Sequence, residues 1–173
     1  LLDESTAAAE GMSLLFNIRS NEQKKKNISK FFVSNKVLPQ TIDLLKTRAE
    51  PIGINIIVDC ENDFNYTNDF FGALFQYPGK HGEIINLPQH VEKATAVNIK
   101  TMVAADLLSL TLLEAPGKFG VDVVVGSSQR FGIPLGYGGP HAAFFATKEE
   151  YKRYIPGRII GQTIDMDNNP AFR

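Results

Sequence analysis

The sequence has a single cysteine, Cys60, among its 173 residues. One cysteine excludes an internal disulfide and any metal site built from several cysteines, and it is compatible with a reducing compartment. We assign Cys60 no role. Long apolar runs are also absent, since stretches such as Phe70 to Phe75 and Val121 to Val125 fall far short of the roughly 20 residues that a membrane span needs. We therefore predict no membrane association.

The chain also lacks an excess of either charge. It has 18 basic and 19 acidic residues, a formal net charge of -1, and a pI near 6.3. No global basic field is available to attract nucleic acid, so small-molecule chemistry or protein contacts are the better expectation. The apolar content of 43% is enough for one domain or a large part of one. Because the chain begins without Met and ends in a polar run, we expect residues 1–173 to be a single segment with both ends truncated.

The order of the predicted elements indicates an α/β fold with a mostly parallel sheet flanked by helices. β-branched and aromatic runs predict strands, and apolar residues at helical spacing predict helices between them. Continuous apolar runs such as Ile54 to Val58 are typical of strands buried on both faces. In such a sheet, ligands bind beyond the carboxyl ends of the strands. The predicted strands are 30–34, 54–58, 71–76, 101–105, 121–125 and 144–147, and the predicted helices are 6–18, 39–49, 87–97, 107–113 and a charged helix from 148 to 154.

The amino-terminal helix carries two carboxylates, Asp3 and Glu4, where its free N–H groups could otherwise attract a phosphate. Helix capping is the stronger interpretation, because these carboxylates stabilise the helix and repel an anion. The three histidines, His81, His90 and His141, do not have the spacing of metal ligands, so we predict no metal. Lys24 to Lys26 are read as a solvated loop.

A glycine-rich loop follows the strand 121–125 at the carboxyl end, where ligands bind in such folds. Gly136, Gly138 and Gly139 permit close approach of a ligand or a neighbouring chain, although a wide turn explains them equally well and no nucleotide-binding fingerprint is present. His141 ends the loop. The strand is followed directly by Ser127, Ser128, Gln129 and Arg130. Arg130 can bind a carboxylate or phosphate but has no amine that could form an imine, and an ion pair with a residue such as Asp106 is the plain structural alternative.

Several long ungapped stretches resemble the glycine decarboxylase P-protein family of the glycine cleavage system. These stretches are LLDESTAAAEGM, FFVSNKVLPQTIDLLKTRAE, VAADLLSL, APGKFGVDVVVGSSQRFGIPLGYGGPHAAFFA and YKRYIPGRIIG, and they are spread in order over nearly the whole chain. The resemblance implies a pyridoxal-phosphate fold-type-I (aspartate-aminotransferase-like) large domain, working as a dimer of tandem halves or as an α2β2 tetramer. It also implies decarboxylation of glycine and transfer of the aminomethyl group to the lipoyl arm of the carrier H-protein.

Within that family the chain resembles the amino-terminal half, or the separate α-type subunit. The cofactor-binding half has a His-Lys pair where this sequence has Gln129-Arg130. Val103 and Ala104 stand near the position expected for the aspartate that pairs with the pyridinium nitrogen, with Asp106 slightly displaced, and Asp3 and Glu4 fall near the phosphate-anchoring region. These differences imply that the pyridoxal phosphate is bound by the other half, and that this segment is inactive alone and forms the interface to the active half.

Two other hypotheses remain open. This half could bind pyridoxal phosphate through another lysine, such as Lys118 or Lys148. Alternatively, the chain is a non-enzymatic module that binds an anion or a partner at Arg130 and the glycine-rich loop. The expected compartment is the mitochondrial matrix if the source is eukaryotic and the cytoplasm if it is bacterial, and no targeting signal is visible in this segment.

Overall fold

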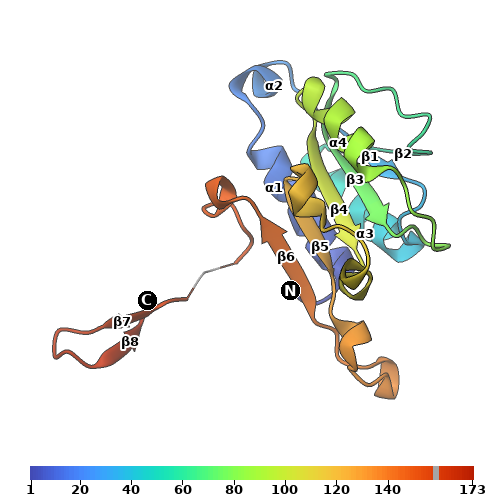
Figure 1. Ribbon diagram of the computed structural model, residues 1–173. Coiled ribbons are helices and arrows are strands. Elements are labelled where there is room, and N and C mark those ends of the chain that lie inside the picture. Colours follow the sequence, from blue (N-terminus) through green and yellow to red (C-terminus); the bar gives the residue numbers. More distant parts are fainter. Residues whose placement is uncertain (158–159) are drawn as a thin grey trace.

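The computed structural model describes residues 1–157 and 160–173, and its main feature is a six-stranded sheet of order β2-β1-β3-β4-β5-β6 (Figure 1). Neighbouring strands from β2 to β5 are parallel, whereas β6 runs antiparallel to β5. The strands are β1 (Lys30–Ser34), β2 (Asn55–Asp59), β3 (Phe70–Tyr77), β4 (Lys100–Ala105), β5 (Val123–Ser127) and β6 (Ala143–Thr147). The predicted mostly parallel α/β fold is confirmed.

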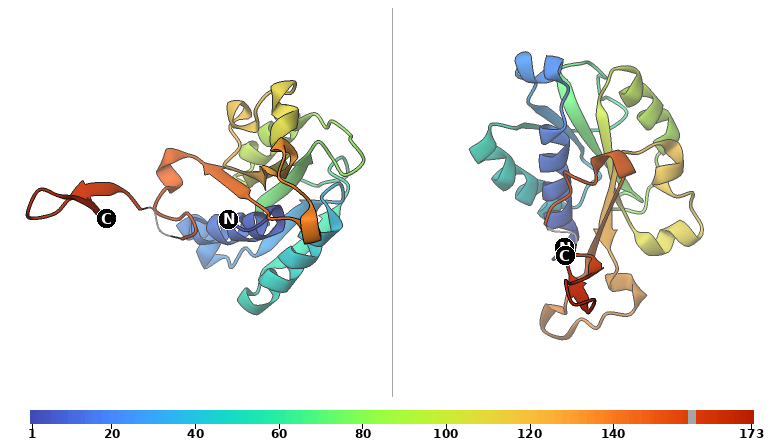
Figure 2. Two further views of the ribbon diagram at one scale, coloured as in Figure 1. Left: turned by 90° about the horizontal axis from the view of Figure 1, so that it is seen from below. Right: turned by 90° about the vertical axis from the view of Figure 1, so that its left-hand side faces the viewer.

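Helices cover both faces of the sheet, as the two turned views show (Figure 2). One face is covered by α1 (Glu4–Asn17) and α3 (Pro39–Ala49). The other is covered by α4 (Leu87–Ala96) and the short 3-10 helices η2 (Leu107–Thr111) and η3 (Pro116–Phe119). Each face therefore has its own apolar core, with the sheet between them. No helix in the described part of the chain is long and apolar enough to cross a membrane.

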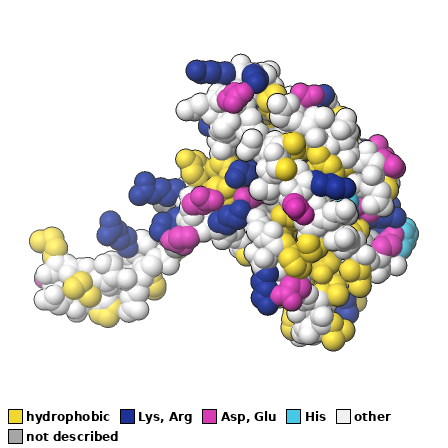
Figure 3. All heavy atoms as spheres, turned by 45° about the horizontal axis from the view of Figure 1, so that its top comes forward, with side chains coloured by type: hydrophobic (Ala, Val, Ile, Leu, Met, Phe, Trp, Pro, Cys, Tyr) yellow, Lys and Arg dark blue, Asp and Glu magenta, His cyan; other side chains and the backbone are white. Residues whose placement is uncertain are grey.

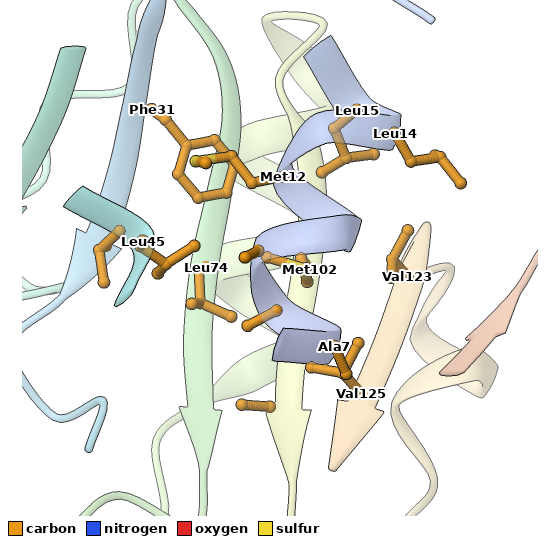
Figure 4. Close-up of a cluster of buried hydrophobic side chains, with 14 of the residues drawn as sticks. Ala7, Met12, Leu14, Leu15, Phe31, Leu45, Leu74, Met102, Val123 and Val125 are labelled. Atoms are coloured by element: carbon orange, nitrogen blue, oxygen red, sulfur yellow. The ribbon is translucent and has the colours of Figure 1, made fainter. Parts of the chain in front are cut away.

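Helix α1 packs directly on strands β3 to β6 of the sheet (Figure 4). Met12 and Leu15 are fully buried against Leu74 of β3 and Met102 of β4. Gly11 makes the close approach possible, because a Cβ added there would lie 2.3 Å from the Met102 sulfur. The helix begins at the N-cap Asp3, whose side chain accepts the Thr6 N–H at 2.6 Å. The start of α1 is thereby fixed at the carboxyl end of the strands, next to β3 and β4.

Some sequence predictions were wrong. The run Ile54 to Val58 does form β2, but β2 is an edge strand and is largely exposed, with Val58 37% exposed. A β-branched run predicts a strand but does not distinguish a central strand from an edge. The helix expected over 148–154 is only the 3-10 turn η6 (Glu149–Tyr151), and the helix expected over 107–113 is the 3-10 helix η2.

The lysine-rich stretch is a short exposed helix and not a loop. Ser20 and Gln23 form a capping box that starts α2 (Asn21–Lys25). After β6 the chain continues into a two-stranded hairpin, β7 (Gln162–Ile164) and β8 (Pro170–Phe172), which extends away from the sheet (Figure 1). The resemblance stretch 151–161 falls partly outside the described residues, because 158 and 159 are not among them.

Candidate functional site

Four side chains meet where β3, β4 and β5 end and α1 begins, and we call Glu4, Gln76, Asp106 and Arg130 the edge cluster. Gln76 is the next-to-last residue of β3 and is 5% exposed. Asp106 follows β4, and Arg130 lies in the 3-10 turn η4 (Gln129–Phe131) that follows β5. In a parallel sheet these strand ends share one edge, which is where α/β folds bind ligands.

Arg130 forms an ion pair with Asp106, which the sequence analysis gave as the alternative to binding a ligand. The guanidinium Nη1 donates to Asp106 Oδ2, while Asp106 Oδ1 accepts the Leu108 N–H at 3.1 Å. The Arg130 side chain is 65% exposed and that of Asp106 is 22% exposed. A pair this exposed contributes little to stability. Its main effect is to hold the turn after β5 against the end of β4.

Ser127, the last residue of β5, and Ser128, which follows it, stabilise the base of the glycine-rich loop. Ser127 Oγ accepts the Gln129 N–H at 3.1 Å. Ser128 donates twice to the Ala142 carbonyl oxygen, from its backbone N–H at 2.9 Å and from its hydroxyl at 3.0 Å. These bonds join the two ends of the loop before β6 begins. Their observed role is therefore structural.

The rest of the glycine-rich loop leaves this edge and extends past the end of the sheet (Figure 1, orange). Gly138 and Gly139 have φ values of 87° and 72°, and a Cβ on Gly139 would lie 2.3 Å from the Pro134 carbonyl oxygen. The turn itself therefore requires glycine. Gly136, Tyr137 and His141 are exposed. The structure brings Ser127, Ser128, Gln129 and Arg130 close to Asp106 but does not bring Gly136 to His141 there.

Sequence reasoning missed the role of Glu4 and Gln76. Asp3 caps α1 as predicted, but the Glu4 carboxyl turns inward, within hydrogen-bonding reach of the Gln76 amide. Burial, the largest cause, raises the pKa of Glu4 from 4.5 to about 7, and the nearby Asp106 and Asp3 carboxylates raise it further while the Gln76 hydrogen bond lowers it. The one available signal was a glutamine inside the otherwise apolar strand FFGALFQY.

The lysines considered as alternative cofactor ligands lie at the opposite end of the sheet, where the parallel strands begin. Lys118 belongs to η3, before β5 begins, and pairs with Glu114. Lys148 follows β6, which is antiparallel, and its Nζ lies 2.8 Å from Asp122 Oδ1. Neither amine is near the edge cluster. No group of three or more potential metal ligands is present among the described residues.

Comparison of the fold with solved structures gives the class of protein. The structure resembles those of cystathione gamma lyase from Micromonospora echinospora (TM-score 0.61, 14% identity, 88% of this chain and 39% of that one) and cystathionine gamma-lyase from Lactobacillus plantarum (0.62, 16%, 86% and 37%). This is the α/β fold of fold-type-I pyridoxal-phosphate enzymes. The family model described as glycine cleavage system P-protein matches residues 1–173. The chain belongs to that family.

Individual relatives agree with this assignment. The glycine dehydrogenase (decarboxylating) of Christiangramia forsetii is 61% identical over 173 residues, and that of Nostoc punctiforme is 55% identical. The matches cover this whole chain but only 18% and 17% of those proteins, so the chain spans less than a fifth of their length. A crystal structure of glycine decarboxylase (P-protein) in inhibitor-bound form matches with a TM-score of 0.84 at 29% identity, covering 99% of this chain and 39% of that one.

Proposed function

We propose that this chain is a segment of a glycine decarboxylase that releases CO2 from glycine and transfers the aminomethyl group to the lipoyl arm of H-protein. The family assignment and the relatives that are glycine dehydrogenases (decarboxylating) support this proposal. The partners are then the lipoylated H-protein and the other half, or a β-type subunit, of the same enzyme. Because the relatives are bacterial, we place the protein in a bacterial cytoplasm.

Within that enzyme, this segment supports the chemistry without holding the cofactor. The observation that carries this proposal is the Asp106–Arg130 ion pair at the end of β5. A guanidinium cannot form an imine, and that of Arg130 is already paired with Asp106. Asp106 is also the carboxylate nearest in sequence to the position expected for the aspartate that pairs with the pyridinium nitrogen. The buried Glu4 carboxyl occupies the start of α1, where a phosphate would need free N–H groups. The edge cluster therefore does not fit pyridoxal phosphate, and we derive no reaction step through it.

An interface role is supported by apolar side chains that this chain leaves exposed. Leu135 and Tyr137 of the glycine-rich loop are 71% and 113% exposed. On the hairpin, Ile164 and Phe172 are 65% and 87% exposed, and the space-filling view shows hydrophobic side chains along this arm (Figure 3). An isolated two-stranded hairpin is marginally stable in water. Contacts with the remainder of the enzyme would stabilise the hairpin and bury these side chains.

The proposal is tested on the full-length protein with and without Arg130→Lys. The wild-type protein should release CO2 from carboxyl-labelled glycine only when lipoylated H-protein is supplied. Since the edge cluster does not fit the cofactor, Arg130→Lys should leave the pyridoxal phosphate content per chain unchanged, as measured by alkaline release and absorbance. Wild-type protein without glycine decarboxylation would refute the enzyme assignment. Gain of a second equivalent of cofactor in the variant would refute the cofactor-free role.

A further inference from the structure

Two acceptor oxygens in the edge cluster are buried without a hydrogen bond. Glu4 Oε1 and Gln76 Oε1 both lack a partner among the residues that the structure describes. Gln76 is 5% exposed, so water does not readily reach its side chain. A buried acceptor without a donor destabilises the folded state. The two side chains lie within hydrogen-bonding reach of each other. A single change at this pair could therefore provide both oxygens with a partner.

Two other carboxylates act on the Glu4 carboxyl group. Gln76 of β3 reaches the carboxyl group, and the Asp3 and Asp106 carboxylates lie near enough to oppose its ionisation. In the turn after β5, the cation Arg130 is bound to Asp106. An ionised Glu4 would place a further negative charge in this half-buried space. A single proton on Glu4 would supply a donor for an unpaired oxygen and would remove the negative charge of the carboxylate.

We propose that Glu4 carries a proton at neutral pH and forms a two-bonded ring with Gln76, in which the carboxyl O–H donates to Gln76 Oε1 and the amide N–H donates to the other carboxyl oxygen. A carboxylic acid and a primary amide have matching donors and acceptors, so both orphaned oxygens gain a partner at once. The pair joins the first turn of α1 to the end of β3. Loss of the proton breaks one of the two bonds and adds a charge beside Asp106.

This pair makes the edge of the sheet sensitive to pH near neutrality. The folded-state pKa of Glu4, about 7, lies above its ordinary value of 4.5, so the folded protein binds this proton more tightly than the unfolded chain. The stabilisation is complete below about pH 4.5 and is lost as the pH rises through 7. The inference is independent of where the cofactor binds, because it uses only Glu4, Gln76 and the charges around them.

The test compares the full-length wild-type protein with Glu4→Gln, which keeps both hydrogen bonds but cannot titrate. Difference infrared spectra between pH 5 and pH 9 should contain a protonated-carboxyl band in the wild type that disappears with a midpoint near 7 and is absent from the variant. The melting temperature of the wild type should fall relative to that of Glu4→Gln over the same range. Glu92→Gln, on the exposed face of α4, is the matched control and should follow the wild-type profile.

Two results would overturn the proposal. One is a Glu4 band that titrates near 4.5, which would mean that an external donor satisfies the pair. The other is a melting profile for Glu4→Gln that superimposes on the wild-type profile at every pH. If Glu4→Gln does not fold, the wild type labelled with ¹³C at the glutamate carboxyl groups still decides, because the proposal requires a glutamate that titrates near 7 and its absence refutes the proposal.

Discussion

At the residue scale, Asp122 shows how a single buried carboxylate holds the other end of the sheet. Its side chain is 8% exposed and accepts the Thr101 N–H at 2.9 Å, Lys148 Nζ at 2.8 Å and the Tyr151 hydroxyl at 3.1 Å. Burial, followed by the charge of Asp122, raises the pKa of Tyr151, so this hydroxyl stays a donor. The carboxylate therefore ties the start of β4 to the segment after β6.

We predict that Asp122→Ala lowers the free energy of unfolding by about 2–3 kcal/mol, because the buried Thr101 N–H loses its acceptor. Lys100 and Lys148, which both pair with Asp122, are about 40% exposed and can return to water, so the loss of these ion pairs adds little. Urea denaturation of the full-length protein, with the exposed Asp63→Ala as control, measures the difference. Equal stability of the two variants would show that Asp122 has no such structural role.

The sequence predicted residue roles unevenly. Arg130 and Asp106 were recognised because their chemistry is specific and both follow strands. Glu4 was interpreted only as a helix-end charge, since its burial depends on Gln76, which is distant in sequence and adjacent only after β3 and α1 pack. Local patterns report capping and strand periodicity. They do not report which polar side chain a distant element will cover.

At the element scale, the predictions succeeded where one local cause decides the structure. The strand Lys30 to Ser34 was predicted with the observed bounds, and the helix predicted to begin at Pro39 does begin there, because strand propensity and a proline at the first helical turn act locally. The edge position of β2 was missed, since strand order is set by the connections and not by the strand itself. The turn after Lys148 was predicted as a helix because its charges have helical spacing, but Asp122 binds Lys148 and Tyr151 at its two ends.

Gly126 carries an element-scale prediction, because β5 passes close to β4 at this point. A Cβ there would lie 2.2 Å from the Ala105 carbonyl oxygen and 2.6 Å from the Phe144 ring. Gly126→Ala should therefore destabilise the fold by about 1–3 kcal/mol through overpacking. Gly117→Ala is the matched control, since nothing lies within 4 Å of its added Cβ, and thermal melting compares the two. A Gly126→Ala variant as stable as Gly117→Ala would contradict the described packing of β5.

At the scale of the whole molecule, the sheet and both helical layers form within this chain, while the exposed loop and hairpin lack a cover. The composition could not predict this division, because the apolar percentage of the sequence counts buried and exposed apolar residues alike. The family resemblance predicted an interface to another half and placed residues of the glycine-rich loop there, but it made no prediction for the hairpin. We therefore regard this chain as one well-packed part of a longer protein, and under the proposed function the catalytic lysine lies outside it.

The location of that lysine tests the proposed cofactor-free role of this chain most directly. The full-length protein, loaded with pyridoxal phosphate, is reduced with borohydride, digested, and mapped for pyridoxyl-lysine by mass spectrometry. If this chain is cofactor-free, we expect a stoichiometric adduct on a lysine outside residues 1–173. A stoichiometric adduct on Lys118, Lys148 or any other lysine of this chain would contradict it.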